Sequence, residues 1–209
     1  MDSRSDSLHG EASATCNTNQ SDCDLVYLKS DRIYLHKLVR IQYTTYDVRR
    51  EQDVVNPSTP HRDIMLLATA MDNDVNHSFL YACVLGIYHP NVTYAGDDIQ
   101  NYQARQFKFL WVRWYRYQGQ NVQWRDLKLD VLSFPSVTSD GTFGFVDPGD
   151  VLHTCHIIPA FSSSKKYPDE VGLSRSANDS QDWSRYYVNR YVQVSTALAP
   201  HLSYSTQLC

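Results

Sequence analysis

The stretch Phe107-Lys-Phe-Leu-Trp-Val-Arg-Trp-Tyr-Arg-Tyr117 decides how this sequence folds. Six of its eleven residues are aromatic, and Val112 adds a β-branched side chain. Aromatic and β-branched residues fit the pleated surface of a sheet, so the stretch predicts the strongest strand of the chain. Gly119 then supplies a turn signal. A β domain built around this strand is the first expectation.

Further β-rich runs lie on both sides of this strand, and turn signals such as Asn56-Pro57 and Asp140-Gly141 separate them. No helical periodicity alternates with them, which predicts an all-β barrel or sandwich over residues 25–160. Gly86, inside one run, predicts a bulge or a close backbone approach. The expected strands cover residues 25–28, 33–35, 38–43, 64–69, 79–88, 107–117, 127–132, 143–146 and 151–158.

The flanking segments have a different composition. Residues 1–24 contain no aromatic side chain and five serines, which predicts a disordered N-terminal tail. Polar stretches predict a loop over residues 49–62 and a linker over residues 161–182. Residues 183–209 are expected to form a C-terminal helix and a divergent tail. The helix rests on the spacing of Trp183, Tyr187, Tyr191, Val194 and Leu198.

The charge is unevenly distributed along the chain. The formal net charge of −4 resides in residues 1–24, where five acids face one base, so the rest is neutral. This excludes a uniformly basic nucleic-acid binder. Residues 101–128, however, hold six bases and one acid between two acidic stretches. They predict one basic stripe, formed by Arg105, Lys108, Arg113 and Arg116.

No assembled catalytic motif or nucleotide-binding motif occurs in the sequence. His153-Thr154-Cys155-His156 brings three potential metal ligands together. A structural zinc site normally needs four converging ligands in two paired clusters, and no second pair is evident. We therefore predict no metal, no cofactor and no catalytic residue. Five widely spaced cysteines and the absence of a long apolar run favour a reducing compartment and no membrane contact.

The basic-aromatic strand is the candidate binding element. Trp114 and Tyr115, where the strand ends, are predicted to form an aromatic surface with Tyr88, while Phe107 and Phe109 fill the core. Such a surface could stack nucleic-acid bases beside phosphate-binding arginines, Arg113 and Arg116 among them. It could equally cage a methylated lysine, with Asp97 and Asp98 as an acidic rim. In a third alternative, all these aromatics are structural.

Two resemblances narrow these alternatives. Phe109–Arg116, Asp150–Ile157 and Leu80–Ile87 resemble motifs of the bromo-adjacent homology (BAH) domain, although His153-Thr154 replaces that family's Gly-Lys. This resemblance implies a small SH3-like barrel with long loops that binds chromatin or protein in the nucleus. A second set of segments resembles the C-terminal accessory region of fungal Plavaka and Kyakuja–Dileera–Zisupton transposon-derived proteins. These segments are Val39–Pro57, Gly144–Pro148, Cys155–Phe161 and Asp182–Arg190.

The catalytic region of such elements has no counterpart in this sequence. Together the resemblances imply a non-catalytic recognition module, all-β with a short C-terminal helix, whose partner is a histone tail or another nuclear protein. DNA remains an alternative partner, and a degenerate structural fragment is a third possibility. The sequence leaves the oligomeric state open.

Overall fold

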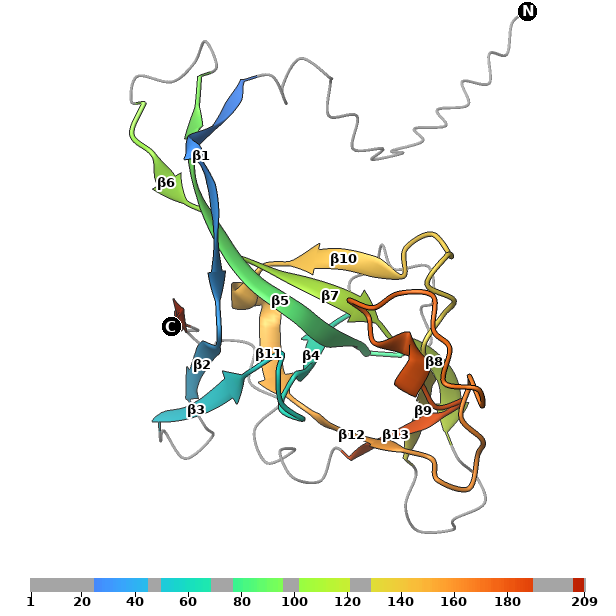
Figure 1. Ribbon diagram of the computed structural model, residues 1–209. Helices are drawn as coiled ribbons and strands as arrows, with labels where there is room; N and C mark the ends of the chain where they lie inside the picture. Colours follow the sequence, from blue (N-terminus) through green and yellow to red (C-terminus); the bar gives the residue numbers. More distant parts are fainter. Residues whose placement is uncertain are drawn as a thin grey trace, which may run out of the picture.

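The computed structural model describes residues 25–44, 50–68, 77–95, 102–120, 129–189 and 205–208. These residues are mainly strands, which confirms the all-β prediction (Figure 1). The described helices are two short 3-10 turns, η1 (Pro148–Asp150) and η2 (Asp179–Gln181), and neither is long enough to cross a bilayer. The strands are β1 (Val26–His36), β2 (Val39–Thr44), β3 (Arg50–Val55), β4 (Asp63–Leu67), β5 (Phe79–Tyr94), β6 (Arg105–Gln106), β7 (Phe109–Trp114), β8 (Arg116–Gln120), β9 (Asp130–Ser133), β10 (Phe143–Val146), β11 (Val151–Thr154), β12 (His156–Pro159), β13 (Tyr186–Asn189) and β14 (Ser205–Leu208).

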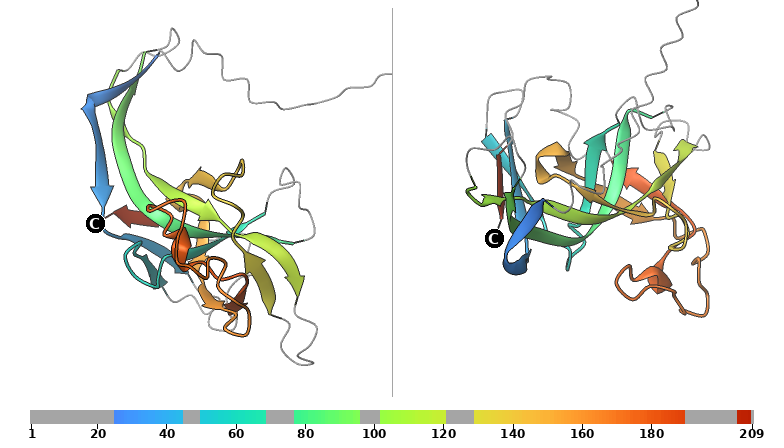
Figure 2. Two further views of the ribbon diagram at one scale, coloured as in Figure 1. Left: turned by 45° about the vertical axis from the view of Figure 1, so that its right-hand side comes forward. Right: turned by 90° about the horizontal axis from the view of Figure 1, so that it is seen from above.

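A seven-stranded antiparallel sheet forms the middle of the molecule, and β5 is its spine. The main strand order is β10-β7-β5-β4-β11, and β1 and β6 pair with the far end of β5. That end of β5, with β1 and β6, forms an arm that projects from the body (Figures 1 and 2). Two further sheets, β12-β13-β9-β8 and β14-β2-β3, complete the described part. All three sheets are open, so the strands described do not form a closed barrel.

Two hydrophobic cores lie on opposite faces of the middle sheet because side chains alternate along its strands. In β4, Ile64 and Leu66 enter the first core, which also contains Val39 and Val55 of the three-stranded sheet. Met65 points the other way into the second core, which contains side chains of the four-stranded sheet such as Val188. Each face of the middle sheet is therefore covered in part by one smaller sheet.

The chain crosses from the middle sheet to the four-stranded sheet at two places. The single strand predicted over residues 107–117 breaks at Tyr115, so that β7 and β8 belong to different sheets. The strand predicted over residues 151–158 breaks at Cys155 in the same way. The amides of Tyr115 and Cys155 donate hydrogen bonds to the carbonyls of Tyr81 and Asp63, both at 2.9 Å. The two sheets diverge from these crossings.

Two predictions of local structure are wrong. Part of the loop expected over residues 49–62 is strand β3, whose Val55 is buried opposite Val39. The helix expected from Trp183 onward is instead strand β13 over Tyr186–Asn189, between β12 and β9. Tyr186 and Val188 are buried alternately, so the period of two prevails over the weaker helical spacing. The rest of that predicted helix and the predicted disordered tail over residues 1–24 lie outside the described residues.

Residues 161–182, expected as a polar linker, pack against the body. Asp179 is buried, and its carboxylate accepts hydrogen bonds from the amides of Leu173 and Ser174, both at 2.9 Å. Lys165 forms a β-bridge with Trp183. The Lys166 ammonium donates to the Phe134 carbonyl at 3.1 Å, and Trp183 packs against the second core, so the segment that carries Asp182 folds back onto that core.

Candidate functional site

The three aromatic residues predicted to share one surface lie in three different environments. Trp114 packs against the first core, and its indole nitrogen would lie 2.5 Å from a Cβ on Gly144. Tyr115, the next residue, faces the opposite side and packs against the second core. Tyr88 belongs to neither core cluster and stacks on Phe109, with ring centroids 5.4 Å apart. The predicted surface of Trp114, Tyr115 and Tyr88 is therefore wrong, because neighbouring positions on a strand point to opposite faces.

Arg113 is buried, with 1% of its surface exposed. Its Nη1 and Nη2 donate to the two carboxylate oxygens of Asp182 at 3.0 and 2.7 Å. Its guanidinium carbon also lies 3.9 Å from the centre of the Phe134 ring. The expectation that Arg113 contacts a partner is wrong, because its guanidinium already pairs with the carboxylate of Asp182, 69 residues further along the chain.

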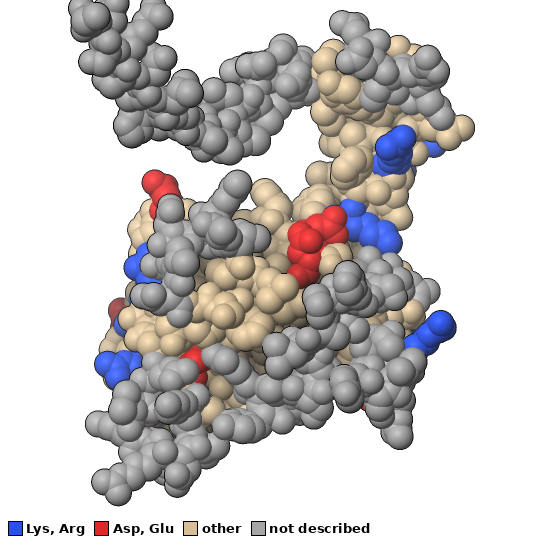
Figure 3. Space-filling model, turned by 180° about the vertical axis from the view of Figure 1, so that it is seen from behind, with Lys and Arg blue, Asp and Glu red and all other residues tan. Residues whose placement is uncertain are grey.

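The other members of the predicted basic stripe are dispersed. Arg105 is exposed on β6, Lys108 is half-buried between β6 and β7, and Arg116 is exposed on β8 in another sheet. On the face shown in Figure 3, the basic side chains lie at separate points and form no continuous band. The predicted basic stripe therefore does not form, since its four basic residues are divided between the arm, the interior and a second sheet. Arg125, Lys128 and the predicted acidic rim of Asp97 and Asp98 lie outside the described residues.

A different group of aromatics does gather on one surface. The aromatic face consists of Tyr88, Phe109, Trp111, Phe143 and Phe145, from the neighbouring strands β5, β7 and β10. Phe109 meets Phe145 edge to face at 5.4 Å, and Trp111 lies 6.0 Å from Phe143. None of the five belongs to either core cluster, and 73% of Phe145 is exposed.

The sequence signal at Gly86 is part of this surface. The register between β5 and β7 shifts between Val84 and Gly86, which confirms the predicted bulge. A Cβ on Gly86 would lie 2.5 Å from the Tyr88 ring, which confirms a close approach as well. The glycine thus lets the Tyr88 ring fold over its own strand beside Phe109.

The aromatic face lies on the same side of the middle sheet as the second core. Phe109, Trp111 and Arg113 alternate along β7 and so share one side of the sheet. Beneath the four-stranded sheet that side is closed around Arg113, whereas beyond it Phe109 and Trp111 are half-buried. Phe109, predicted as core, belongs to this face, and Phe143 and Phe145 carry no local signal for it because only strand pairing brings them to β7. Phe107, also predicted as core, is 57% exposed.

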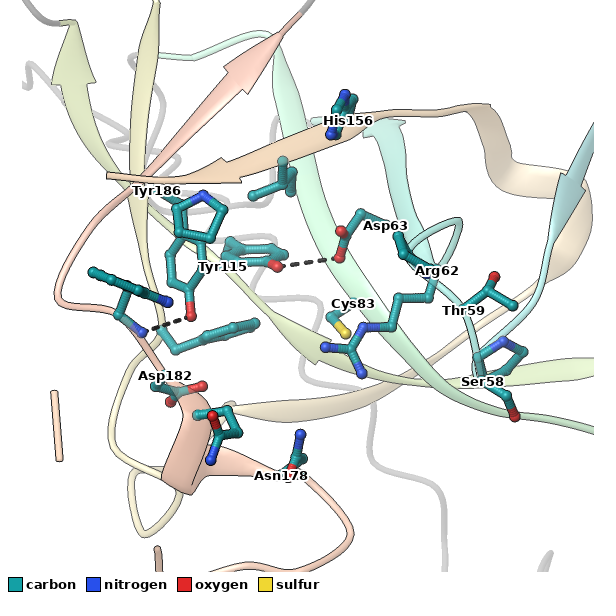
Figure 4. A pocket seen from close by; sticks show the side chains of 18 residues that line it. Ser58, Thr59, Arg62, Asp63, Cys83, Tyr115, His156, Asn178, Asp182 and Tyr186 are labelled. Atoms are coloured by element: carbon teal, nitrogen blue, oxygen red, sulfur yellow. Dashed lines mark hydrogen bonds between the residues drawn. The ribbon is translucent and has the colours of Figure 1, made fainter. Parts of the chain in front are cut away.

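A pocket of about 520 Å³ lies where the middle and four-stranded sheets diverge (Figure 4). We call it the Arg62 pocket. Cys83 comes from β5 of the middle sheet, Tyr115 from the crossing between β7 and β8, and Tyr186 from β13 of the four-stranded sheet. The loop containing Ser58 and Thr59 and the segment around η2 form other sides of the opening. The pocket thus combines aromatic walls from the second core with polar groups from two loops.

Asp63 is the buried acid of this pocket. Its carboxylate accepts a hydrogen bond from the Tyr115 hydroxyl at 3.1 Å. Burial raises the pKa of Asp63 to about 7, although the Arg62 charge and the Tyr115 hydrogen bond oppose this rise. Burial, and then the neighbouring Asp63 charge, raise the pKa of the Cys83 thiol to about 12. Cys83 is therefore a thiol at neutral pH and does not present a thiolate nucleophile.

The four-residue cluster of potential metal ligands is split by the crossing at Cys155. His153 is buried with its Nδ1 3.4 Å from Asp53, which also accepts a hydrogen bond from the Thr154 amide at 2.9 Å. His156 is exposed on β12 in the other sheet. Among the residues described, no three His, Cys, Asp or Glu side chains converge as a metal site.

Comparison with known proteins adds no assignment to this geometry. No protein-family model, no curated protein and no solved structure matches the chain.

Proposed function

We propose that this chain is a non-catalytic recognition module that binds an extended segment of a partner protein across the aromatic face. The observation that carries the proposal is a set of five aromatic side chains on adjacent strands, outside both cores. Aromatic residues are enriched at protein interfaces, where large rigid rings bury apolar area at little cost in conformational entropy. A cluster of partly exposed aromatic side chains outside the core is typical of an interaction site.

The edge of the middle sheet supports an extended ligand. In the described ranges β10 pairs with β7 on one side and with no strand on the other. The open side offers backbone donors and acceptors to an added strand. Alternate side chains of such a strand would lie beside Phe143 and Phe145, so the backbone would supply affinity and the aromatic face would supply selectivity.

The setting of the module is proposed from the sequence resemblances alone. BAH-like motifs support a BAH-like fold and a chromatin partner, such as a histone tail, in the nucleus. The second resemblance supports an accessory domain of a fungal transposon-derived protein. A methyl-lysine cage is an alternative form of this recognition; Asp97 and Asp98, predicted for its rim, lie outside the described residues.

Single-stranded nucleic acid is a second candidate ligand. The segments that build the aromatic face, residues 79–95, 102–112 and 141–146, contain Arg105 and Lys108 and no acid. Aromatic side chains on a sheet can stack on nucleobases while neighbouring Arg and Lys side chains of the protein contact phosphates. Such binding would weaken steeply as the salt concentration rises.

Substitutions on the face test the module and separate the two ligands. Trp111→Ala and Phe145→Ser should abolish binding on an array of modified and unmodified histone-tail peptides. Phe161→Ser, at an equally exposed ring outside the face, should leave it unchanged. Fluorescence anisotropy with a single-stranded oligonucleotide at low and high salt measures the second candidate. The proposal would be refuted if the native protein bound neither peptides nor the oligonucleotide. It would also be refuted if both substitutions left the binding unchanged in protein that is still folded.

A further inference from the structure

We infer that the Arg62 pocket binds a carboxylate carried on an apolar or aromatic group, at a site separate from the aromatic face. The inference does not depend on the protein-recognition proposal. It rests on one cation that points into the pocket, on the charges around that cation, and on the aromatic wall beside it.

The cation is Arg62, in the loop that leads into β4. Its half-buried side chain extends into the pocket, and its guanidinium lies beside Cys83 (Figure 4). Within the described ranges the guanidinium has no hydrogen-bond or ion-pair partner. A partly desolvated guanidinium is a strong donor, and its planar fork matches the two oxygens of a carboxylate.

The neighbouring charges leave Arg62 available for an anion. Asp182, on the far side of the pocket, is neutralised in a bidentate pair with Arg113. Asp63, next to Arg62, has a pKa of about 7 because it is buried, so near neutral pH much of it is protonated. The pocket therefore carries a positive charge that no described residue fully balances. One guanidinium beside a carboxyl group suits a monoanion better than a phosphate dianion.

The remaining walls define the rest of the ligand. Phe134 and Tyr186 stand edge to face at 5.4 Å, and Trp183 also lines the pocket. These rings can pack against a flat apolar group. The volume of about 520 Å³ falls within the range of about 300–1,000 Å³ that is typical of small-molecule sites. Exposed Ser58 and Asn178 at the rim show that the pocket opens to solvent.

Two probes distinguish the possible sources of a carboxylate carried on an apolar group. Phenylacetate represents a free small acid, and acetyl-Gly-Gly-Phe with a free carboxyl terminus represents a peptide end. Each is titrated into the full chain at pH 6.5, with quenching of tryptophan fluorescence and isothermal calorimetry as the readouts, since Trp183 lines the pocket. Phenylacetamide and the peptide amide are the uncharged controls, and inorganic phosphate is the control anion.

We expect saturable binding of at least one carboxylate probe, with the tighter one identifying the source. Arg62→Gln should weaken it about 10–100-fold, the usual effect of losing a charged hydrogen bond. Arg62→Lys should restore part of the affinity, and Arg50→Gln, at an exposed arginine on β3, should leave it unchanged. Unchanged thermal unfolding would show that the Arg62 variants are folded. No saturable binding, equal binding of the amides or of phosphate, or binding insensitive to Arg62→Gln would overturn the inference.

Discussion

The buried carboxyl of Asp63 makes the stability of this protein depend on pH in a way that one substitution should remove. Only 7% of Asp63 is exposed, and burial raises its pKa from 3.8 to about 7. Between these two values the folded state holds a proton that the unfolded chain has released. The free energy of unfolding must therefore fall as the pH rises from about 4 to about 7, and it should be constant with respect to this group above and below that window.

The size of the effect follows from the two pKa values. At 1.36 kcal/mol for each unit of pKa, the rise from 3.8 to about 7 corresponds to about 4 kcal/mol over the whole window. About 3 kcal/mol of this remains between pH 4.5 and 7.5. Asp63→Asn removes the ionisation and keeps an oxygen that can accept the hydrogen bond from Tyr115. The variant should therefore gain stability relative to the native protein as the pH rises.

Urea unfolding of both proteins, followed by tryptophan fluorescence from pH 4.5 to 8.5, measures this difference directly. The other ionisable groups are common to both chains and cancel in the comparison. Asp140→Asn, at an exposed turn position, is the matched control and should track the native protein at every pH. Parallel curves for Asp63→Asn and the native protein would refute the reasoning. A native protein that gained stability relative to Asp63→Asn with rising pH would show instead that Arg62 holds Asp63 ionised.

Three further substitutions test the architecture by urea unfolding. Arg113→Met should cost about 3–5 kcal/mol because it leaves Asp182 buried without its partner, and adding Asp182→Leu should recover much of the loss. Gly86→Ala should cost no more than about 2 kcal/mol, because its Cβ meets only the end of the Tyr88 ring, whose NMR signals should shift. Asp179→Ala should cost about 2 kcal/mol through the loss of two amide hydrogen bonds. Full stability of the Arg113 or Asp179 variant, or unshifted Tyr88 signals in Gly86→Ala, would contradict the corresponding contact.

The sequence predicted the strands far better than it predicted where their side chains go. The run at residues 107–117 is recognisable as strand from composition alone, and Gly86 correctly predicted a bulge. The break at Tyr115 has no local signal, since no glycine or proline marks it. It arises because the amide of Tyr115 bonds to Tyr81, on a strand that the sequence does not identify as a neighbour.

The candidate sites were harder to predict because both depend on contacts between distant segments. Arg113 and Asp182 are 69 residues apart, and nothing near either residue indicates the pair. Phe145 joins Trp111 through the pairing of β10 with β7, whereas the local signal at Asp140-Gly141 indicates only a turn. Charge and aromatic content along residues 107–117 could predict that β7 contributes to a binding site. They could not predict where each side chain lies, because successive side chains of a strand point to opposite faces of the sheet.

The buried pair of Arg113 and Asp182 explains how one strand can serve both proposed sites. Desolvation of two charges cancels much of their attraction, so the pair is weak evidence for added stability. Its geometry is specific, however, because a bidentate fork fixes the position of Asp182 and thus of the segment that closes one side of the Arg62 pocket. The same strand carries Trp111 to the aromatic face two residues earlier. β7 therefore contributes Trp111 to the aromatic face and, through Arg113, holds the segment that closes one side of the Arg62 pocket.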